Sequence, residues 1–153
     1  MNTEELILQF LLEVTNGNIE IYNKFSLQHE LGIYLRNKIN DKNKKVQFER
    51  NIAFFDLETE DYEKKEIDIV IYQDDGRTNP DVAIELKFPR NGAIPEQMFH
   101  ICKDVMFTEQ LMLNKFNKAY VLSIIEDHLF YEGRAKDGIY KYFRTGHLHP
   151  FME

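Results

Sequence analysis

The sequence predicts a single domain of the mixed α/β (α+β) class, in which helices flank a central mixed sheet. Strand-like runs rich in branched apolar residues follow one another at 46–55, 66–72 and 81–87. A helical pattern with a proline at its start then covers 95–114, and another apolar strand run covers 118–125. Three successive strands, a helical crossover and a fourth strand give a mixed sheet with helices on both faces.

Two helices are predicted ahead of the first strand. The first covers 3–14 with Thr3 as its N-cap, and the second runs from an N-cap at Ser26 to about Ile39. The apolar residues of the second helix recur at a spacing close to 3.6 and predict its buried face: Leu27, Leu31, Tyr34, Leu35 and Ile39.

The long helix and the C-terminal part complete the pattern. Met98, Cys102, Val105 and Met112 are predicted to form the buried stripe of the long helix. Beyond the last core strand, 139–143 is a candidate for one more strand.

Composition and charge narrow the class of protein. At 153 residues, with 43% apolar and 29% charged residues, the chain suits one soluble domain, 1–153. Its single cysteine, Cys102, excludes an internal disulfide and fits a cytoplasmic location. The acidic N-terminus predicts no export signal, and no apolar run is long enough to suggest a membrane partner. The net charge of −7 argues against a general nucleic-acid coating protein but not against a carboxylate enzyme.

Strand alternation brings three ionisable residues to one face of the predicted sheet. Successive side chains of a strand point to opposite faces, so Asp68 lies opposite the isoleucines at 67, 69 and 71. By the same rule Glu85 and Lys87 share a face of the next strand. Two carboxylates and an amine at the end of a sheet form a binding site for a hard divalent cation.

This arrangement resembles the PD-(D/E)xK nuclease superfamily, also called the restriction-endonuclease-like fold, whose core order is αβββαβ. Asp68 matches the acid on the second core strand, and Glu85-Leu86-Lys87 matches the Glu-x-Lys of the third. Glu30 matches the additional acid of the core helix. The resemblance covers about 26–125, which makes 3–14 an N-terminal addition and 126–153 a C-terminal extension.

The literal Pro80-Asp81 pair is not the better match to the first motif. It precedes Glu85 by only four residues, and at ~3.3 Å per residue the two carboxylates would lie ~13 Å apart on one strand. Asp68 on the neighbouring strand avoids this problem, although Ile67 replaces the motif's proline.

The resemblance implies a Mg²⁺-dependent (or Mn²⁺-dependent) nuclease. Asp68, Glu85 and the Leu86 carbonyl would bind the metal, one of whose waters can attack the phosphate. Lys87 would help to activate that water, and Glu30 could bind a second metal or a metal-bound water. The alternative for the charged trio is a surface salt-bridge ladder, and for Glu30 an ordinary, partly exposed helix residue.

DNA is the expected partner, with RNA left open, and a homodimer is a hypothesis because many enzymes of this fold dimerise to cut two strands. Basic residues from two segments are candidates for a phosphate-contacting rim, with solvated surface charge as the alternative: Lys42, Lys44, Lys45, Arg134 and Lys136. Two further functions stay open. One is a catalytically inactive binding or regulatory module on the same fold, and the other is a hydrolase of a smaller phosphate ester.

Overall fold

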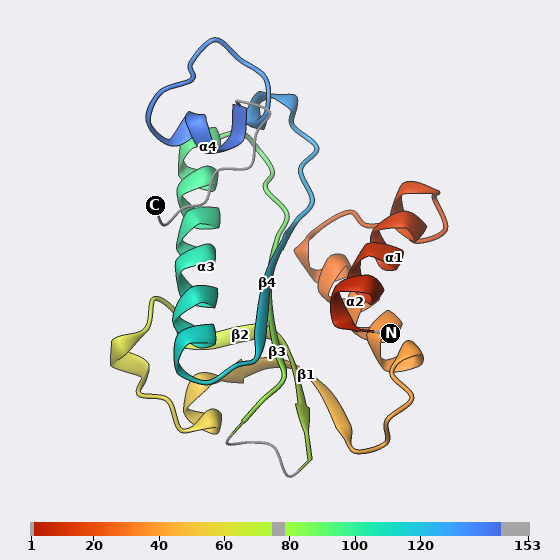
Figure 1. Ribbon diagram of the computed structural model, residues 1–153. Helices are drawn as coiled ribbons and strands as arrows, with labels where there is room; N and C mark the ends of the chain where they lie inside the picture. Colours follow the sequence, from red (N-terminus) through yellow and green to blue (C-terminus); the bar gives the residue numbers. More distant parts are fainter. Residues whose placement is uncertain (1, 75–78, 145–153) are drawn as a thin grey trace.

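The fold is a mixed α+β arrangement built on one four-stranded sheet (Figure 1). The computed structural model describes residues 2–74 and 79–144, so parts of the predicted turn at 74–80 and of the C-terminal extension lie outside the described residues. The strands lie in the order of their numbers: β1 Lys44–Asn51, β2 Glu66–Gln73, β3 Val82–Lys87 and β4 Lys118–Ser123. The first three are antiparallel neighbours, and β4 is parallel to β3.

Helices cover both faces of this sheet. α1 (Thr3–Thr15) and α2 (Lys24–Lys38) lie together on one face, and α3 (Ile94–Asn114) lies on the other (Figure 1). One apolar cluster fills the space between the sheet and the helices α1 and α2, and it includes Phe10, Leu31 and Ile69. A second cluster fills the space below α3 and includes Ile67. The prediction that Ile67 shares a face with Ile69 is therefore wrong.

Asparagines rather than hydroxyl residues begin the first two helices. Asn2 caps α1, and its side chain accepts the Glu5 amide. Asn23 caps α2, and Ser26, the predicted N-cap, is instead the partner residue that bonds back to the Asn23 amide. α2 thus begins two residues before the predicted N-cap, and Lys24 lies in its first turn, where it bears on the candidate site below.

The first strand is shorter than predicted. β1 ends at Asn51, and Ile52–Phe55 forms a 3-10 turn capped by the Asn51 side chain. Ile52 and Phe55 point into the cluster below α3, so their apolar character reflects burial in a turn. The strand proposed at 139–143 is also wrong, because Gly138–Tyr140 is a 3-10 turn and α4 covers Lys141–Arg144.

α3 buries only one residue of the predicted stripe. Pro95 does lie in its first turn and Met98 is buried as predicted, but the other buried residues include Ile101 and Leu111. Cys102 is only half-buried, and Met112 is exposed. The helix carries apolar residues on several sides, so spacing alone allowed more than one stripe. Asp104 belongs to the true buried stripe.

Candidate functional site

The candidate site lies where the hydrogen-bonded ladder of the sheet opens around Asp68. The pairing of β1 with β2 passes from Phe48 opposite Ile69 to Arg50 opposite Ile67 and skips Asp68. The skipped partner, Glu49, has a left-handed backbone with φ of 51°. The pairing of β2 with β3 also ends one residue away, at Ile69 opposite Ile84. The main chain around Asp68 must therefore find other hydrogen-bond partners.

Side chains supply these partners and tie the two strands together. The Leu86 amide donates to Asp68 Oδ2 at 2.8 Å, and the Asp68 amide donates to Glu85 Oε1 at 3.2 Å. The Asp68 carbonyl accepts from Gln28 Nε2 of α2 at 2.8 Å. Each carboxylate thus accepts a hydrogen bond from a main-chain amide of the opposite strand. These two bonds hold the acids side by side.

Each of these two acids also contacts a lysine from outside the sheet. Lys24 Nζ, from the first turn of α2, lies 2.9 Å from Asp68 Oδ1. Lys64, from the segment before β2, donates to Glu85 Oε2. Both lysines are partly exposed, at 42% and 29% of their side chains, so their ammonium groups reach the buried acids from the surface.

A third acid, Asp104 of α3, contacts both Lys87 and Lys64. Asp104 Oδ2 lies 2.9 Å from Lys87 Nζ, and its Oδ1 lies 3.6 Å from Lys64 Nζ. Asp104 Oδ2 is buried and makes no well-aligned hydrogen bond with any described residue, so Lys87 interacts with it through charge and proximity. We refer to these six residues as the charge cluster: Lys24, Lys64, Asp68, Glu85, Lys87 and Asp104.

Burial changes the proton affinity of the charge cluster. Glu85 is fully buried, and this burial, followed by the negative charge of Asp68, raises its pKa from 4.5 to about 8 despite the opposing effect of Lys64. Burial alone would lower the pKa of Lys64, but the charges of Glu85, Asp104 and Asp68 outweigh it and raise that pKa. Burial therefore favours the protonated form of Glu85, and the neighbouring acids favour the charged form of Lys64.

The structure brings together Asp68, Glu85, Leu86 and Lys87, as the strand pattern predicted, but not Glu30. Glu30 has no contact with Asp68 or Glu85 among the described residues, and it lines a surface hollow on α2 instead. Residues two apart on a helix point to widely separated directions, and it is Gln28 that faces Asp68.

The predicted basic rim lies in two separate places. Lys44 and Lys45 pair with Asp81 and Asp74 at the end of the sheet remote from Asp68, and Lys42 borders the same hollow as Lys44. Two more members, Arg134 and Lys136, are exposed in the segment that follows β4, at the upper end of Figure 1. Lys136 there donates to the Arg144 carbonyl at 2.8 Å. A role for these residues in binding nucleic acid stays a prediction.

Sequence reasoning missed Lys24, Lys64 and Asp104. All three reach the sheet from segments outside the two strands, and a lone lysine or aspartate in such a segment gives no recognisable pattern. For Asp104 there was one signal: it lies three residues after Ile101 and three before Phe107, within a run of buried helix positions.

The donor set around Asp68 suits a hard cation that keeps part of its water shell. Among the described residues, no three His, Cys, Asp or Glu side chains gather in an arrangement that could hold a metal. Mg²⁺, however, is often bound through one or two carboxylates and several waters. The amide and carbonyl of one residue in an extended strand point to the same side, and the Leu86 amide points to Asp68, so the Leu86 carbonyl faces that side as well. Two carboxylates and one carbonyl are therefore available there.

Comparisons with known proteins add no further guide to function. No family model, no curated protein and no solved structure matches the chain. In the part of the chain that the structure describes, no helix has the length and apolarity needed to cross a bilayer.

Proposed function

We propose that the protein is a Mg²⁺-dependent (or Mn²⁺-dependent) phosphodiesterase that acts on DNA. The observation that carries this proposal is the pair of buried acids, Asp68 and Glu85, fixed side by side at an opening in the sheet. Buried acids held close together repel each other and lose hydration, so they cost stability. A divalent cation would remove that cost, which gives the arrangement a function.

The element order supports the same reading. The sequence α2, β1, β2, β3, α3, β4 is the αβββαβ order of a restriction-endonuclease-like core. Asp68 lies on the second of these strands and Glu85 and Lys87 on the third, the positions that the resemblance to the PD-(D/E)xK superfamily implies.

The residues divide the work as follows. Asp68, Glu85 and the Leu86 carbonyl would hold the cation, and Lys24 and Lys64 would leave the acids as it enters. Both lysines can do so because their side chains are partly exposed. When bound, a hard divalent cation supplies Lewis-acid stabilisation of the charge that develops on a phosphoryl group. Lys87, oriented by Asp104, would place its ammonium beside the phosphate and stabilise it by charge.

The charge balance also suits an anionic substrate. The cluster gathers three lysine side chains, Lys24, Lys64 and Lys87, at one place beside the sheet. This concentration of cations contrasts with the overall charge of −7. A phosphate group would therefore meet a favourable local field on a protein that otherwise repels nucleic acid.

A second candidate function is a catalytically inactive binding or regulatory module. The observation that favours it is that every acid of the charge cluster lies within ion-pair distance of a lysine. If these pairs never open, the cluster is a structural network that links α2, α3 and the sheet.

A cleavage assay distinguishes the two candidates. Supercoiled, linear and branched DNA would be incubated with the protein, with and without Mg²⁺ or Mn²⁺, beside Asp68→Ala and Lys87→Ala. The nuclease proposal expects metal-dependent cutting that both variants lose. A matched control is Asp81→Ala, which removes another lysine-paired aspartate from the remote end of the sheet and should cut like the wild type. Cutting that survives in Asp68→Ala would contradict the assigned site.

A further inference from the structure

A surface hollow lies beside the charge cluster, at the N-terminal end of α2. Its volume is about 500 Å³, within the range of sites that bind small molecules. Three aromatic side chains line it, namely Tyr22, Phe25 and Phe48. Polar groups complete the lining through Gln28, His29 and Glu30.

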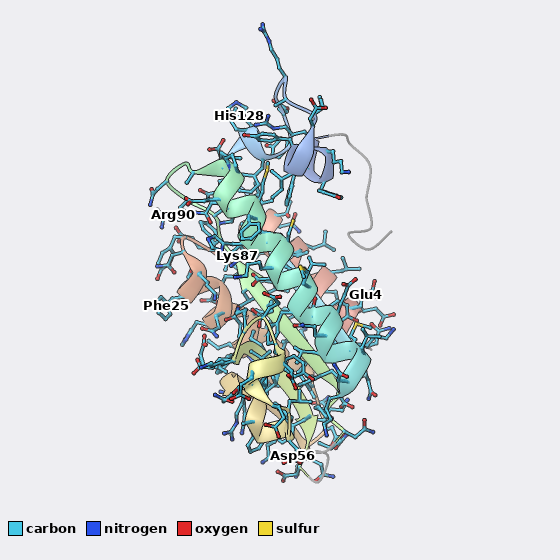
Figure 2. All side chains as sticks on the ribbon, turned by 90° about the vertical axis from the view of Figure 1, so that its left-hand side faces the viewer. Glu4, Phe25, Asp56, Lys87, Arg90 and His128 are labelled. Carbon is cyan, nitrogen blue, oxygen red and sulfur yellow. The ribbon has the colours of Figure 1, made fainter. Side chains whose placement is uncertain are left out.

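Two of the aromatic residues are unusually exposed. Phe25 is 81% exposed and Tyr22 is 62% exposed, whereas most large apolar side chains of the chain are packed into its clusters. In Figure 2, Phe25 extends outward from the molecule on the same side as Arg90. The free-energy cost of exposing a phenylalanine ring to water is removed only when a binding partner covers the ring.

The hollow adjoins the charge cluster. Gln28 connects the two, because it lines the hollow and donates to the main-chain carbonyl of Asp68. Lys24, whose ammonium contacts Asp68, directly precedes Phe25 in the first turn of α2. Arg90 anchors the far rim by donating from Nη1 to the Tyr22 carbonyl at 2.8 Å.

Phe48 forms the inner wall, and α2 is shaped to admit it. Its ring lies against Gly32, where a Cβ would collide with it. The guanidinium of Arg36 lies 5.0 Å from the ring centroid, which further fixes the ring. The Phe48 ring is therefore held between α2 and Arg36, while Tyr22 and Phe25 stand exposed at the mouth.

We propose that this hollow binds an unpaired nucleobase of the nucleic acid whose backbone lies at the charge cluster. The inference rests on the proposed phosphodiesterase function and specifies its substrate class. Aromatic faces stack on any base and bind single strands with little sequence preference. The cations of Lys24 and Arg90 complement the flanking phosphates. Gln28, His29 and Glu30 can donate to and accept from the base edge, which gives Glu30 a role other than metal binding.

The consequence is a preference for single-stranded or frayed substrate. A base within a duplex has both faces covered by its neighbours and must be unstacked before an aromatic side chain can reach it. An unpaired nucleotide avoids this cost. Paired duplex should therefore bind more weakly than a single strand of the same sequence.

A binding experiment without catalysis tests this inference. Short single-stranded DNA and RNA oligonucleotides containing 2-aminopurine, an adenine analogue whose fluorescence falls on stacking, would be titrated with the protein in EDTA, beside the matching duplex. We expect quenching with the single strand and at least about fivefold weaker binding for Phe25→Ala, the effect of losing one base–aromatic stack. Phe25→Tyr should restore binding, and Phe25→Leu should not, because leucine has no π face. Leu113→Ala, at a residue 78% exposed on α3, is the exposure-matched control and should bind like the wild type.

The outcomes separate this inference from the phosphodiesterase proposal. Phe25-dependent quenching without metal-dependent cutting would support the base site and contradict the nuclease. Metal-dependent cutting with equal binding by Phe25→Ala, or equal binding of duplex and single strand, would overturn the base site and leave the nuclease intact. Rescue by Phe25→Leu would also overturn stacking as the mode of binding.

Discussion

Replacing Glu85 by glutamine should stabilise the protein at alkaline pH. Glu85 is fully buried, and its pKa is raised from 4.5 to about 8. The folded protein therefore keeps a proton on Glu85 that the unfolded chain releases between these two pH values. Stability from this group is complete below about pH 4.5 and is lost as the pH rises towards about 8. The reason is that the free energy of unfolding falls with rising pH wherever the unfolded state binds fewer protons than the folded state.

The size of the effect follows from the pKa difference, 8 − 4.5 = 3.5 pH units. Each unit corresponds to about 1.36 kcal/mol, so the Glu85 contribution should fall by about 3 kcal/mol between roughly pH 5 and pH 8. Glutamine has nearly the shape of the protonated acid and does not titrate. Its oxygen can still accept one of the two hydrogen bonds made by Glu85, from the Asp68 amide or from Lys64.

Urea unfolding of wild type and Glu85→Gln across this pH range measures the effect. The difference between the two proteins cancels the titration of all other groups. We expect similar stability near about pH 5 and a variant more stable by about 3 kcal/mol near about pH 8. A variant that is less stable by the same amount at every pH would refute the reasoning, because it would show that Glu85 is ionised and structurally paired throughout.

Three further substitutions test the surroundings of the site. Asp104→Asn should lower the free energy of unfolding by about 1–2 kcal/mol. This is less than the roughly 3–5 kcal/mol expected for breaking a fully buried ion pair, because Lys87 can then reach solvent. Urea unfolding measures the change, and an unchanged stability would show that the pair with Lys87 contributes nothing. Gly32→Ala should cost about 1–3 kcal/mol, since the new methyl group displaces the Phe48 ring; an unchanged melting temperature would contradict this contact. Asn23→Ala should cost about 1 kcal/mol by removing the cap of α2, and circular dichroism during thermal unfolding would show whether it does.

Strand alternation grouped Asp68, Glu85 and Lys87 from the sequence, and the structure places Asp68 and Glu85 side by side. The alternation itself fails around Asp68, because Ile67 and Ile69 pack into different clusters. The opening of the ladder at Asp68 could not be foreseen. It depends on the left-handed backbone of Glu49, a non-glycine residue with no sequence signal for that conformation.

The helical part of the site was harder to predict because small errors in phase change which residue faces the sheet. Choosing Ser26 over Asn23 as the cap hid Lys24, which lies in the first turn of α2. Each residue rotates the direction of a helical side chain by about 100°, so Gln28 faces Asp68 and Glu30, two residues later, points elsewhere. The apolar spacing of α2 does not fix its rotation closely enough to distinguish these positions.

The contributions from distant segments lay beyond any local pattern. Lys64 contacts Glu85 from a loop 21 residues away in sequence, and Asp104 of α3, 19 residues from Glu85, contacts Lys64 in turn. Long lysine side chains reach buried acids from many backbone positions. Their arrangement is decided by the packing of α3 on the sheet, which periodicity does not specify.

The most direct test of the proposed cation site is a calorimetric titration with Mn²⁺ at about pH 8, close to the raised pKa of Glu85. Wild type should bind Mn²⁺ and release protons as Glu85 ionises. Asp68→Asn, which keeps the shape of the side chain, should weaken binding by at least about tenfold. Asp81→Asn, which alters a lysine-paired aspartate remote from the site, should bind like the wild type. Equal binding by Asp68→Asn, or no binding by the wild type, would contradict the assignment of these buried acids to a divalent cation.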